Sequence, residues 1–473
     1  MLHVVLGFKE DEPLKYDVVI VGAGPAGIFS ALELAEKTNL SILMLDRGPD
    51  INQRKCPASR GFECVHCEPC LLLSGWGGAG AFSDGKLTLS TEVGGWLDQY
   101  ISEKSLDKLI NYVDSTYLKY GATEHVYGGD VEKVEEIERK ASLAGLKLIR
   151  QKIRHMGTER CAQTLRKMRQ ELNGKVEVKL KKDVKGLIVK NNTVKGVETV
   201  NGEKFFGRYV IVAPGRSGAE WLQAEAQALG LKTLNNPVDV GIRVEALAPV
   251  MEELTSVLYE PKLIYYSRFF DDQVRTFCVA PYGEVISESY NGVLTVNGQS
   301  YAEKKTKNTN FAILVRTSFT EPFKEPIAYG KYLARLSNIL SGGVMIQRLG
   351  DLEAGRRSTS ERIARSVVTP TLKNATPGDL SFVLPYRYLA DIRETLQALD
   401  KIAPGINSRD TLLYGIEVKF YSSRLQLSNS LETQIYNLFT IGDGAGVTRG
   451  LVQASASGVI VAREITKREK QKA

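Results

Sequence analysis

The chain has 473 residues, of which 43% are hydrophobic and 25% charged, a composition typical of a soluble globular protein with large buried cores. Lys and Arg exceed Asp and Glu by 62 to 55, but the excess charge of +7 is scattered, so we expect no nucleic-acid partner. No run approaches the roughly 20 apolar residues that span a bilayer. Residues 1–12 also lack the basic start of a signal peptide, so we expect a cytoplasmic protein without membrane insertion.

The first predicted elements are a strand, a helix and a second strand. Residues 16–21 form a short β-branched, apolar run, which predicts a parallel strand buried on both faces. A helix is expected over residues 25–37 and a second apolar strand over residues 40–45. This order is that of a βαβ unit.

A glycine motif joins the first strand to the helix. Gly22, Gly24 and Gly27 have the spacing of a dinucleotide-binding turn, in which a pyrophosphate lies at the helix N-terminus. Asp46 follows the second strand, where a carboxylate can accept hydrogen bonds from ribose hydroxyls. The sequence therefore predicts a dinucleotide site.

Four of the six cysteines are crowded together, at Cys56, Cys64, Cys67 and Cys70. Two successive x2 spacings let one loop direct three thiolates to a common point, as in bacterial ferredoxins, so a [4Fe-4S] cluster is the first hypothesis. Zinc held by four thiolates is an alternative, and free or redox-paired thiols are another.

The middle of the chain alternates helical and strand patterns. Residues 131–144 and 158–172 predict amphipathic helices, and residues 176–206 predict an antiparallel meander. A buried-type strand at residues 209–213, which Pro214 and Gly215 end, is expected to return to the first sheet.

The composition changes to β-rich segments and then helices after about residue 231. The expected strands are 238–244, 263–270, 274–279, 293–296 and 311–315, and the expected helices are 329–340 and 388–399. A strand over 438–441, a Gly442-Asp443 turn and a helix over 451–465 close the chain.

We expect an α/β fold with a Rossmann-like FAD-binding domain, formed by a parallel sheet plus an antiparallel β-meander, and an inserted α+β substrate domain. The expected division is 14–230 for the first part of the FAD domain, 231–404 for the insertion and 405–473 for the C-terminal part. Nucleotide-binding elements at both ends of the chain favour FAD over NAD, because the ribityl chain and isoalloxazine extend past one βαβ unit.

The glycine motif, the strand end at 210–215 and the 441–443 turn resemble the FAD-binding fold of the glutathione-reductase-like flavoproteins. The strings at 77–86, 414–424 and 442–458 further resemble a family of NAD(FAD)-utilising dehydrogenases. This resemblance implies FAD, with Asp443 at the ribityl hydroxyls and Asp46 at the adenosine ribose. The expected cofactor-binding residues are Gly22, Gly24, Pro25, Ala26, Gly27, Asp46, Arg47, Gly77, Gly78, Ala79, Gly80, Ser83, Ala213, Gly215, Gly442, Asp443, Gly450, Leu451 and Val452.

The chain departs from glutathione reductase in two respects. It lacks the redox-active cysteine pair after the first helix, and it has no second strand-GxGxxG-helix unit for NAD(P)H. NAD(P)H and a reduced carrier such as ferredoxin are therefore the candidate electron donors. Because the resemblance places the 77–80 loop beside the flavin, an iron–sulfur centre at the cysteines could relay electrons to FAD, whereas zinc could only brace the loop.

We expect an FAD-dependent oxidoreductase that exchanges hydride with a small organic substrate. The candidate catalytic residues are His155, Glu417 and Tyr421. Alternation along a strand places Glu417 and Tyr421 on one face, which is either a substrate wall or a salt-bridged solvent face. Arg356 and Arg357 suit a substrate carboxylate or phosphate, or surface ion pairs. A non-enzymatic redox sensor or electron-transfer protein and, less favoured, a flavin monooxygenase are the alternatives.

Overall fold

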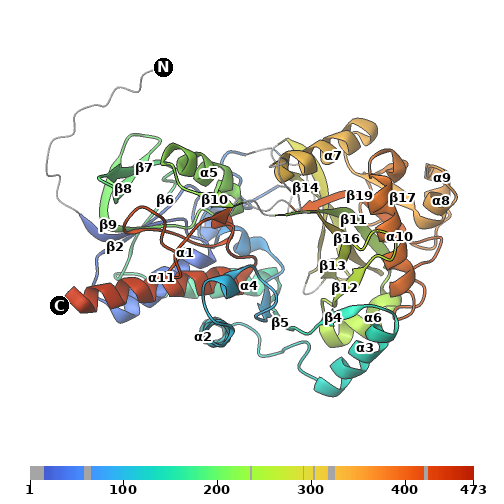
Figure 1. Cartoon of the computed structure of the whole chain (residues 1–473), viewed down its shortest axis with the longest axis horizontal. Helices are drawn as coiled ribbons and strands as arrows, with labels where there is room; N and C mark the ends of the chain where they lie inside the picture. Colours follow the sequence, from blue (N-terminus) through green and yellow to red (C-terminus); the bar gives the residue numbers. More distant parts are fainter. Residues whose placement is uncertain are drawn as a thin grey trace.

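The computed structural model describes residues 15–472, except 58–64, 66, 235–236, 291, 302–303, 318–324 and 420–423. Two sheets with their helices lie side by side, one built around the N-terminal βαβ unit and one around the middle of the chain (Figure 1). In the described part of the chain, we find no helix with the length and apolar character needed to cross a membrane.

The first sheet has the strand order β6-β2-β1-β9-β8-β7, and β21 also pairs with β9. Its parallel members have the apolar sequences expected of strands buried on both faces, except the edge strand β6, whose sequence EVKL is half-buried or exposed. They are β1 (Tyr16–Val21), β2 (Ile42–Asp46), β6 (Glu177–Leu180), β9 (Lys204–Val212) and β21 (Leu438–Thr440). β7 (Val184–Lys190) and β8 (Thr193–Thr199) form the antiparallel meander with the start of β9.

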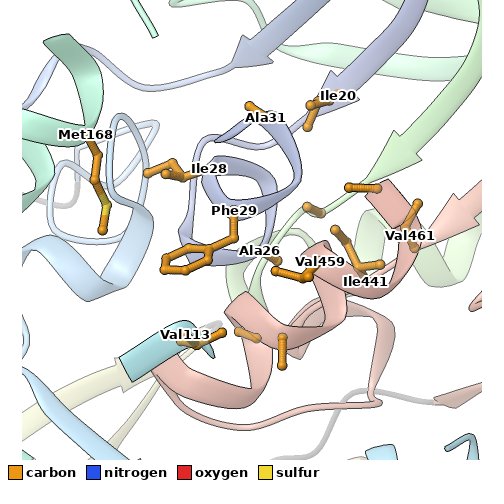
Figure 2. Close-up of a cluster of buried hydrophobic side chains, with 14 of the residues drawn as sticks. Ile20, Ala26, Ile28, Phe29, Ala31, Val113, Met168, Ile441, Val459 and Val461 are labelled. Atoms are coloured by element: carbon orange, nitrogen blue, oxygen red, sulfur yellow. The ribbon is translucent and has the colours of Figure 1, made fainter. Parts of the chain in front are cut away.

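Helices from both ends of the chain cover one face of this sheet. α1 (Pro25–Lys37) packs against α11 (Leu451–Lys472), and Figure 2 shows Ala26 and Phe29 of α1 beside Val459 of α11. A Cβ at Gly458 would lie 2.2 Å from the carbonyl oxygen of Ala26, so a glycine here lets the helices approach closely. α2 (Glu103–Lys119) and α4 (Gly157–Glu171) extend this layer, and α5 (Ala219–Ala228) packs on the opposite face.

The second sheet has eight strands in the order β18-β17-β19-β11-β16-β13-β12-β4. Their bounds are β4 (Lys147–Ile149), β11 (Val238–Leu247), β12 (Lys262–Tyr266), β13 (Gln273–Ala280), β16 (Asn308–Thr317), β17 (Met345–Arg348), β18 (Thr376–Pro377) and β19 (Leu412–Lys419). One face packs on four helices, namely α3 (Val131–Leu143), α6 (Ala248–Leu258), α7 (Pro326–Ser341) and α10 (Tyr386–Leu399).

Shorter elements complete the architecture. The hairpin of β14 (Glu284–Tyr290) and β15 (Val293–Gln299) lies near β11 and β19, and a ribbon of β3 (Lys86–Leu89) and β5 (Lys152–His155) lies between the two sheets. β10 (Thr233–Leu234) pairs with β20 (Arg424–Leu425), and α8 (Leu349–Glu353) and α9 (Ser360–Ala364) follow β17.

Two strands of the second sheet come from outside the expected insertion at 231–404. β4 precedes it and pairs with β12, and β19 follows it and pairs with β11 and β17. β19 carries the buried-strand sequence of residues 412–418, and it closes the sheet between β11 and β17. The second sheet therefore draws on two separate stretches of the chain, residues 147–149 and 238–419, and the longer one extends past the expected boundary at residue 404.

Candidate functional site

The glycine motif places the N-terminus of α1 at the ends of β1 and β9. Gly22 has φ of +108°, and a Cβ there would lie 2.0 Å from the carbonyl oxygen of Ala213. A Cβ at Gly27 would lie 2.0 Å from the carbonyl oxygen of Gly22. Gly24 is the N-cap of α1 and, as a glycine, has no side chain to cap the first turn. The free N–H groups of that turn suit an anion.

The second glycine-rich segment lies directly against this turn. The Gly77 N–H donates to the carbonyl of Ala23 at 2.8 Å, and the short helix η3 (Gly78–Phe82) follows. A Cβ at Gly78 would lie 3.0 Å from the Cα of Gly24, so the two backbones approach as closely as glycines allow. Ala79 lies within η3, and the Ser83 hydroxyl donates to the carbonyl of Gly80 at 2.9 Å. The structure thus brings residues 77–83 to the N-terminus of α1.

Arg54 organises this loop, a role that the sequence alone did not indicate. Its guanidinium, in a side chain that is almost fully buried, donates to the carbonyls of Leu71, Leu72, Trp76 and Gly78 at 2.7 to 2.9 Å. An isolated arginine carries no pattern that predicts backbone contacts, because these depend on how the loop folds around it.

Asp46 also contacts loop backbone. Its carboxylate accepts the N–H groups of Ala23, Gly48 and Gly75, each at 2.8 Å. These bonds use three of the roughly four acceptor positions of a carboxylate. The next residue, Arg47, donates to the Ser74 hydroxyl at 3.1 Å. Asp46 therefore joins the glycine motif to the glycine-rich loop.

The C-terminal segment, residues 442–452, also lies beside the N-terminus of α1. The short helix η7 (Asp443–Ala445) follows β21, and Asp443 accepts a hydrogen bond from the Thr448 hydroxyl at 2.9 Å and from the Gly450 N–H at 3.4 Å. Burial raises the pKa of the Asp443 carboxyl. Gly442 lies beside Ala26, since a Cβ there would approach the Ala26 methyl to 3.1 Å. Leu451 and Val452 begin α11.

Two buried polar atoms near this convergence fit a site for a polar cofactor. Thr164 Oγ1 and Gln453 Oε1 are buried and have no hydrogen-bond partner among the described residues. Gln453 lies in the first turn of α11, and Thr164 lines a cavity with Pro25, Gly80 and Leu451. Within the described part of the chain, a Cβ at Gly215 or Gly450 would meet no atom within 4 Å.

His155 lies between the two domains, on the β3–β5 ribbon. Its ring stacks on that of Tyr259, with centroids 4.5 Å apart, and its Nε2 is buried with no hydrogen-bond partner in the described structure. Burial lowers the pKa of the His155 imidazole. Beside it, Lys86 of β3 forms ion pairs with Glu260 at 2.7 Å and Asp84 at 3.2 Å. This junction holds several titratable groups within reach of one another.

Glu417 is fully buried and paired with two cations. It lies 3.4 Å from Arg243 on β11 and 2.9 Å from Lys419, its neighbour on β19. The face of β19 that carries Glu417 is thus salt-bridged, which agrees with part of the expectation of a salt-bridged solvent face. Glu417 is buried, however, so this face does not contact solvent. Tyr421, the third catalytic candidate, lies outside the described residues.

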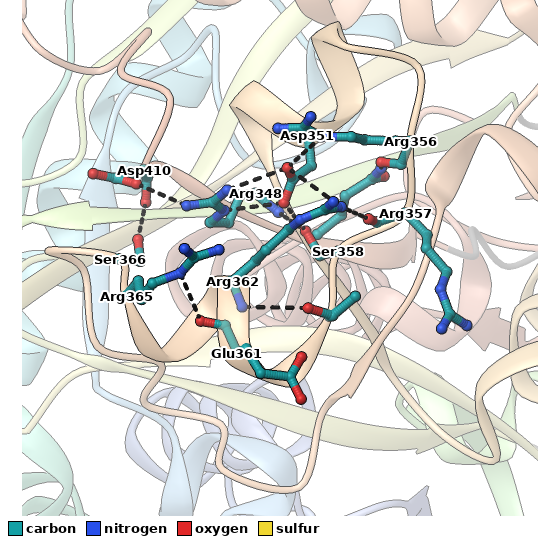
Figure 3. A network of polar contacts seen from close by, with 12 residues as sticks. Arg348, Asp351, Arg356, Arg357, Ser358, Glu361, Arg362, Arg365, Ser366 and Asp410 are labelled. Carbon is teal, nitrogen blue, oxygen red and sulfur yellow. Dashed lines mark hydrogen bonds and ion pairs between the residues drawn. The ribbon is translucent and has the colours of Figure 1, made fainter.

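Arg356 and Arg357 lie at the far end of the second domain from α1 and α11, where Arg356 joins an ion network (Figures 1 and 3). Buried Asp351 accepts hydrogen bonds from Arg348, Arg356 and Ser358. For Arg356 these contacts fit the ion-pairing interpretation, because its guanidinium is bound to Asp351. Arg357 accepts a hydrogen bond from Arg362 through its backbone carbonyl, and both interpretations of its side chain stay predictions.

The cysteine cluster is described in part. Cys56 is buried and Cys67 and Cys70 are partly buried, whereas Cys64 lies outside the described residues. Among the residues described, no group of three His, Cys, Asp or Glu side chains is placed to hold a metal ion. Because Cys64 lies outside the described residues, the metal site expected at the four cysteines stays a prediction.

The chain belongs to a family of flavin enzymes. The model of the FAD dependent oxidoreductase family matches residues 17–281, which is more than half of the chain. A second model, described as the FAD-dependent protein C-terminal domain-like family, matches residues 239–420. The protein is therefore an FAD-dependent oxidoreductase, and the expectations of the fold, of FAD and of the enzyme class are confirmed, whereas the [4Fe-4S] cluster and NAD(P)H stay predictions.

The individual proteins that resemble this chain share less than 30% of its sequence. An uncharacterized protein of Clostridium beijerinckii is 28% identical over 487 residues, covering 96% of this chain and 81% of that protein. L-proline dehydrogenase from P. horikoshii is 14% identical with a TM-score of 0.41, covering 96% of this chain and 94% of that one. Formate oxidase from Aspergillus oryzae is 12% identical with a TM-score of 0.45, covering 97% of this chain and 99% of that one.

Proposed function

We propose that the enzyme holds FAD where α1, residues 77–83 and residues 442–452 meet, and that it oxidises or reduces a small organic molecule by hydride exchange with that flavin. One observation carries the proposal, namely that the uncapped N-terminus of α1, the glycine-rich loop and Asp443 converge from three distant parts of the chain. Bound FAD would supply the hydride acceptor or donor.

Each segment has a distinct task in this proposal. The first-turn N–H groups of α1 bind the pyrophosphate, because they are unpaired and lie at the positive end of the helix dipole. Asp443 accepts hydrogen bonds from the ribityl hydroxyls, and the N-terminus of α11 lies at the pyrimidine end. Asp46 holds the two glycine segments together, and its remaining acceptor position serves the adenosine ribose.

The substrate is proposed to lie between the cofactor and the polar face of the second sheet. His155 is the group that accepts or returns a substrate proton there, since burial favours its neutral form and Nε2 is unpaired in the described structure. Glu417 is assigned to holding Arg243 and Lys419 in place. The electron donor is proposed to be NAD(P)H or a reduced carrier such as ferredoxin, and no step passes through a metal.

The test begins with the flavin content of the purified full chain. We expect a yellow protein with stoichiometric FAD, and turnover with an artificial electron acceptor once a substrate is supplied from a library of small alcohols, amines and acids. Asp443→Ala should release FAD, whereas Asp379→Ala, at a position far from the site on the second domain, should retain it. A colourless protein that does not take up added FAD would refute the proposal.

A further inference from the structure

Lys262 is an unusual cation on the polar face of the second sheet. Its neighbours Leu263 and Tyr265 on β12 point into the hydrophobic core, so Lys262 projects from the opposite face. Other cations of this face are paired, with Arg275 on Asp239 and Lys419 on Glu417. No carboxylate in the described part of the chain forms an ion pair with Lys262.

The surroundings of Lys262 add further positive charge. Burial lowers the pKa of Lys262 to about 8, and the positive charges of Arg275 and Arg449 lower it further. The negative charges of Glu260 and Asp239 have the opposite effect on this pKa. Arg275 also lies 4.6 Å from the ring centroid of Phe277, so an apolar surface adjoins the cations.

Arg449 connects this cluster to the proposed cofactor site. It immediately precedes Gly450 and the start of α11, and its guanidinium lies 4.7 Å from the ring centroid of Trp96. Lys262, on the second sheet, is close enough to Arg449 for the two charges to interact. The cluster therefore bridges the substrate-facing sheet and the segment assigned to the flavin.

A partly buried ammonium without a direct ion-pair partner is costly, and an anion placed beside it reduces that cost. We propose that Lys262, flanked by Arg275 and Arg449, binds an oxyanion of the substrate, either a carboxylate or a phosphate. This inference rests on the proposed function, because it places the anion next to the flavin. The enzyme would thus select anionic substrates over their neutral analogues.

The experiment measures ligand binding to the FAD-loaded full chain through the flavin absorbance spectrum and by calorimetry. The probes are hexanoate, its neutral analogue hexanamide, and inorganic phosphate. We expect hexanoate or phosphate to bind about tenfold or more tightly than hexanamide, as for one charge-assisted hydrogen bond. Hexanoate binding identifies a carboxylate and phosphate binding identifies a phosphate.

Lys262→Met should remove this preference without loss of FAD, and Lys262→Arg should keep it. Lys401→Met, which removes an exposed lysine of the same domain, should leave it unchanged. In the wild type the anion affinity should fall as the pH rises through about 8, and in Lys262→Arg it should not.

The inference is overturned if the FAD-loaded wild type binds neither anion better than hexanamide, or if Lys262→Met keeps the preference. A Lys262→Met variant that changes only flavin retention also overturns it, since Lys262 would then act on the cofactor. Failure of the wild type to bind FAD would instead refute the proposed function.

Discussion

Replacing Glu417 by glutamine distinguishes a structural carboxylate from a catalytic one. The substitution keeps the shape of the side chain and removes its charge, which leaves Arg243, fully buried, and Lys419, 12% exposed, without their shared counter-ion. Breaking a buried ion pair from one side costs about 3 to 5 kcal/mol, because the remaining charge stays desolvated. We expect the free energy of unfolding of Glu417→Gln to fall by about this amount.

The assay is urea unfolding of the FAD-loaded chain, followed by circular dichroism and flavin fluorescence. Glu353→Gln, at an exposed carboxylate of the same domain, is the matched control and should change stability by less than about 0.5 kcal/mol. Adding Lys419→Gln to Glu417→Gln should recover part of the loss, since it removes one unpaired cation. A Glu417→Gln variant as stable as the wild type but without turnover would refute this reasoning and support a catalytic role.

Three further substitutions test the cofactor site and the junction. Asp443→Asn should weaken FAD binding by about tenfold or more in equilibrium dialysis, because an amide accepts ribityl hydrogen bonds less strongly than a carboxylate. Gly27→Ala should lower the thermal stability of the FAD-free protein, since its Cβ would lie 2.0 Å from the Gly22 carbonyl oxygen. Burial lowers the pKa of His155 in the folded protein below its ordinary value of about 6.5. The stability linked to the neutral imidazole is therefore present above about pH 6.5 and is lost as the pH falls below that value. His155→Gln should reduce this loss of stability at acid pH, measured by denaturation at a series of pH values.

The N-terminal βαβ unit could be predicted closely because its signals are local. The observed bounds of β1 and α1 are those expected, and β2 begins two residues later than expected. The strand β14 was not predicted, since its sequence EVISESY mixes polar and apolar residues in the half-buried position of a hairpin. β9 was predicted as two strands, but it is continuous because β8 pairs with its first half and β21 with its second.

The candidate cofactor residues could be chosen from motifs, whereas the contacts that position them could not. Glycine spacing indicates the phosphate turn, and the structure does bring Gly22, Gly77 and Asp443 to one place. The four backbone bonds of Arg54 and the three of Asp46 depend on loops that meet only in the folded chain. Contacts of this kind produce no pattern in the sequence from which they could be predicted.

The polar face of the second sheet carries more buried charge than domain contact alone requires. On β11, Val240 and Val244 point into the core, while Asp239, Arg243 and Glu245 alternate with them on the other face. A face that served only to join domains would gain stability from apolar residues, because buried ion pairs recover their desolvation cost poorly. Retaining charge there is useful where a polar molecule must be recognised, so the determinants of specificity are expected on this face and those of cofactor binding on the first domain.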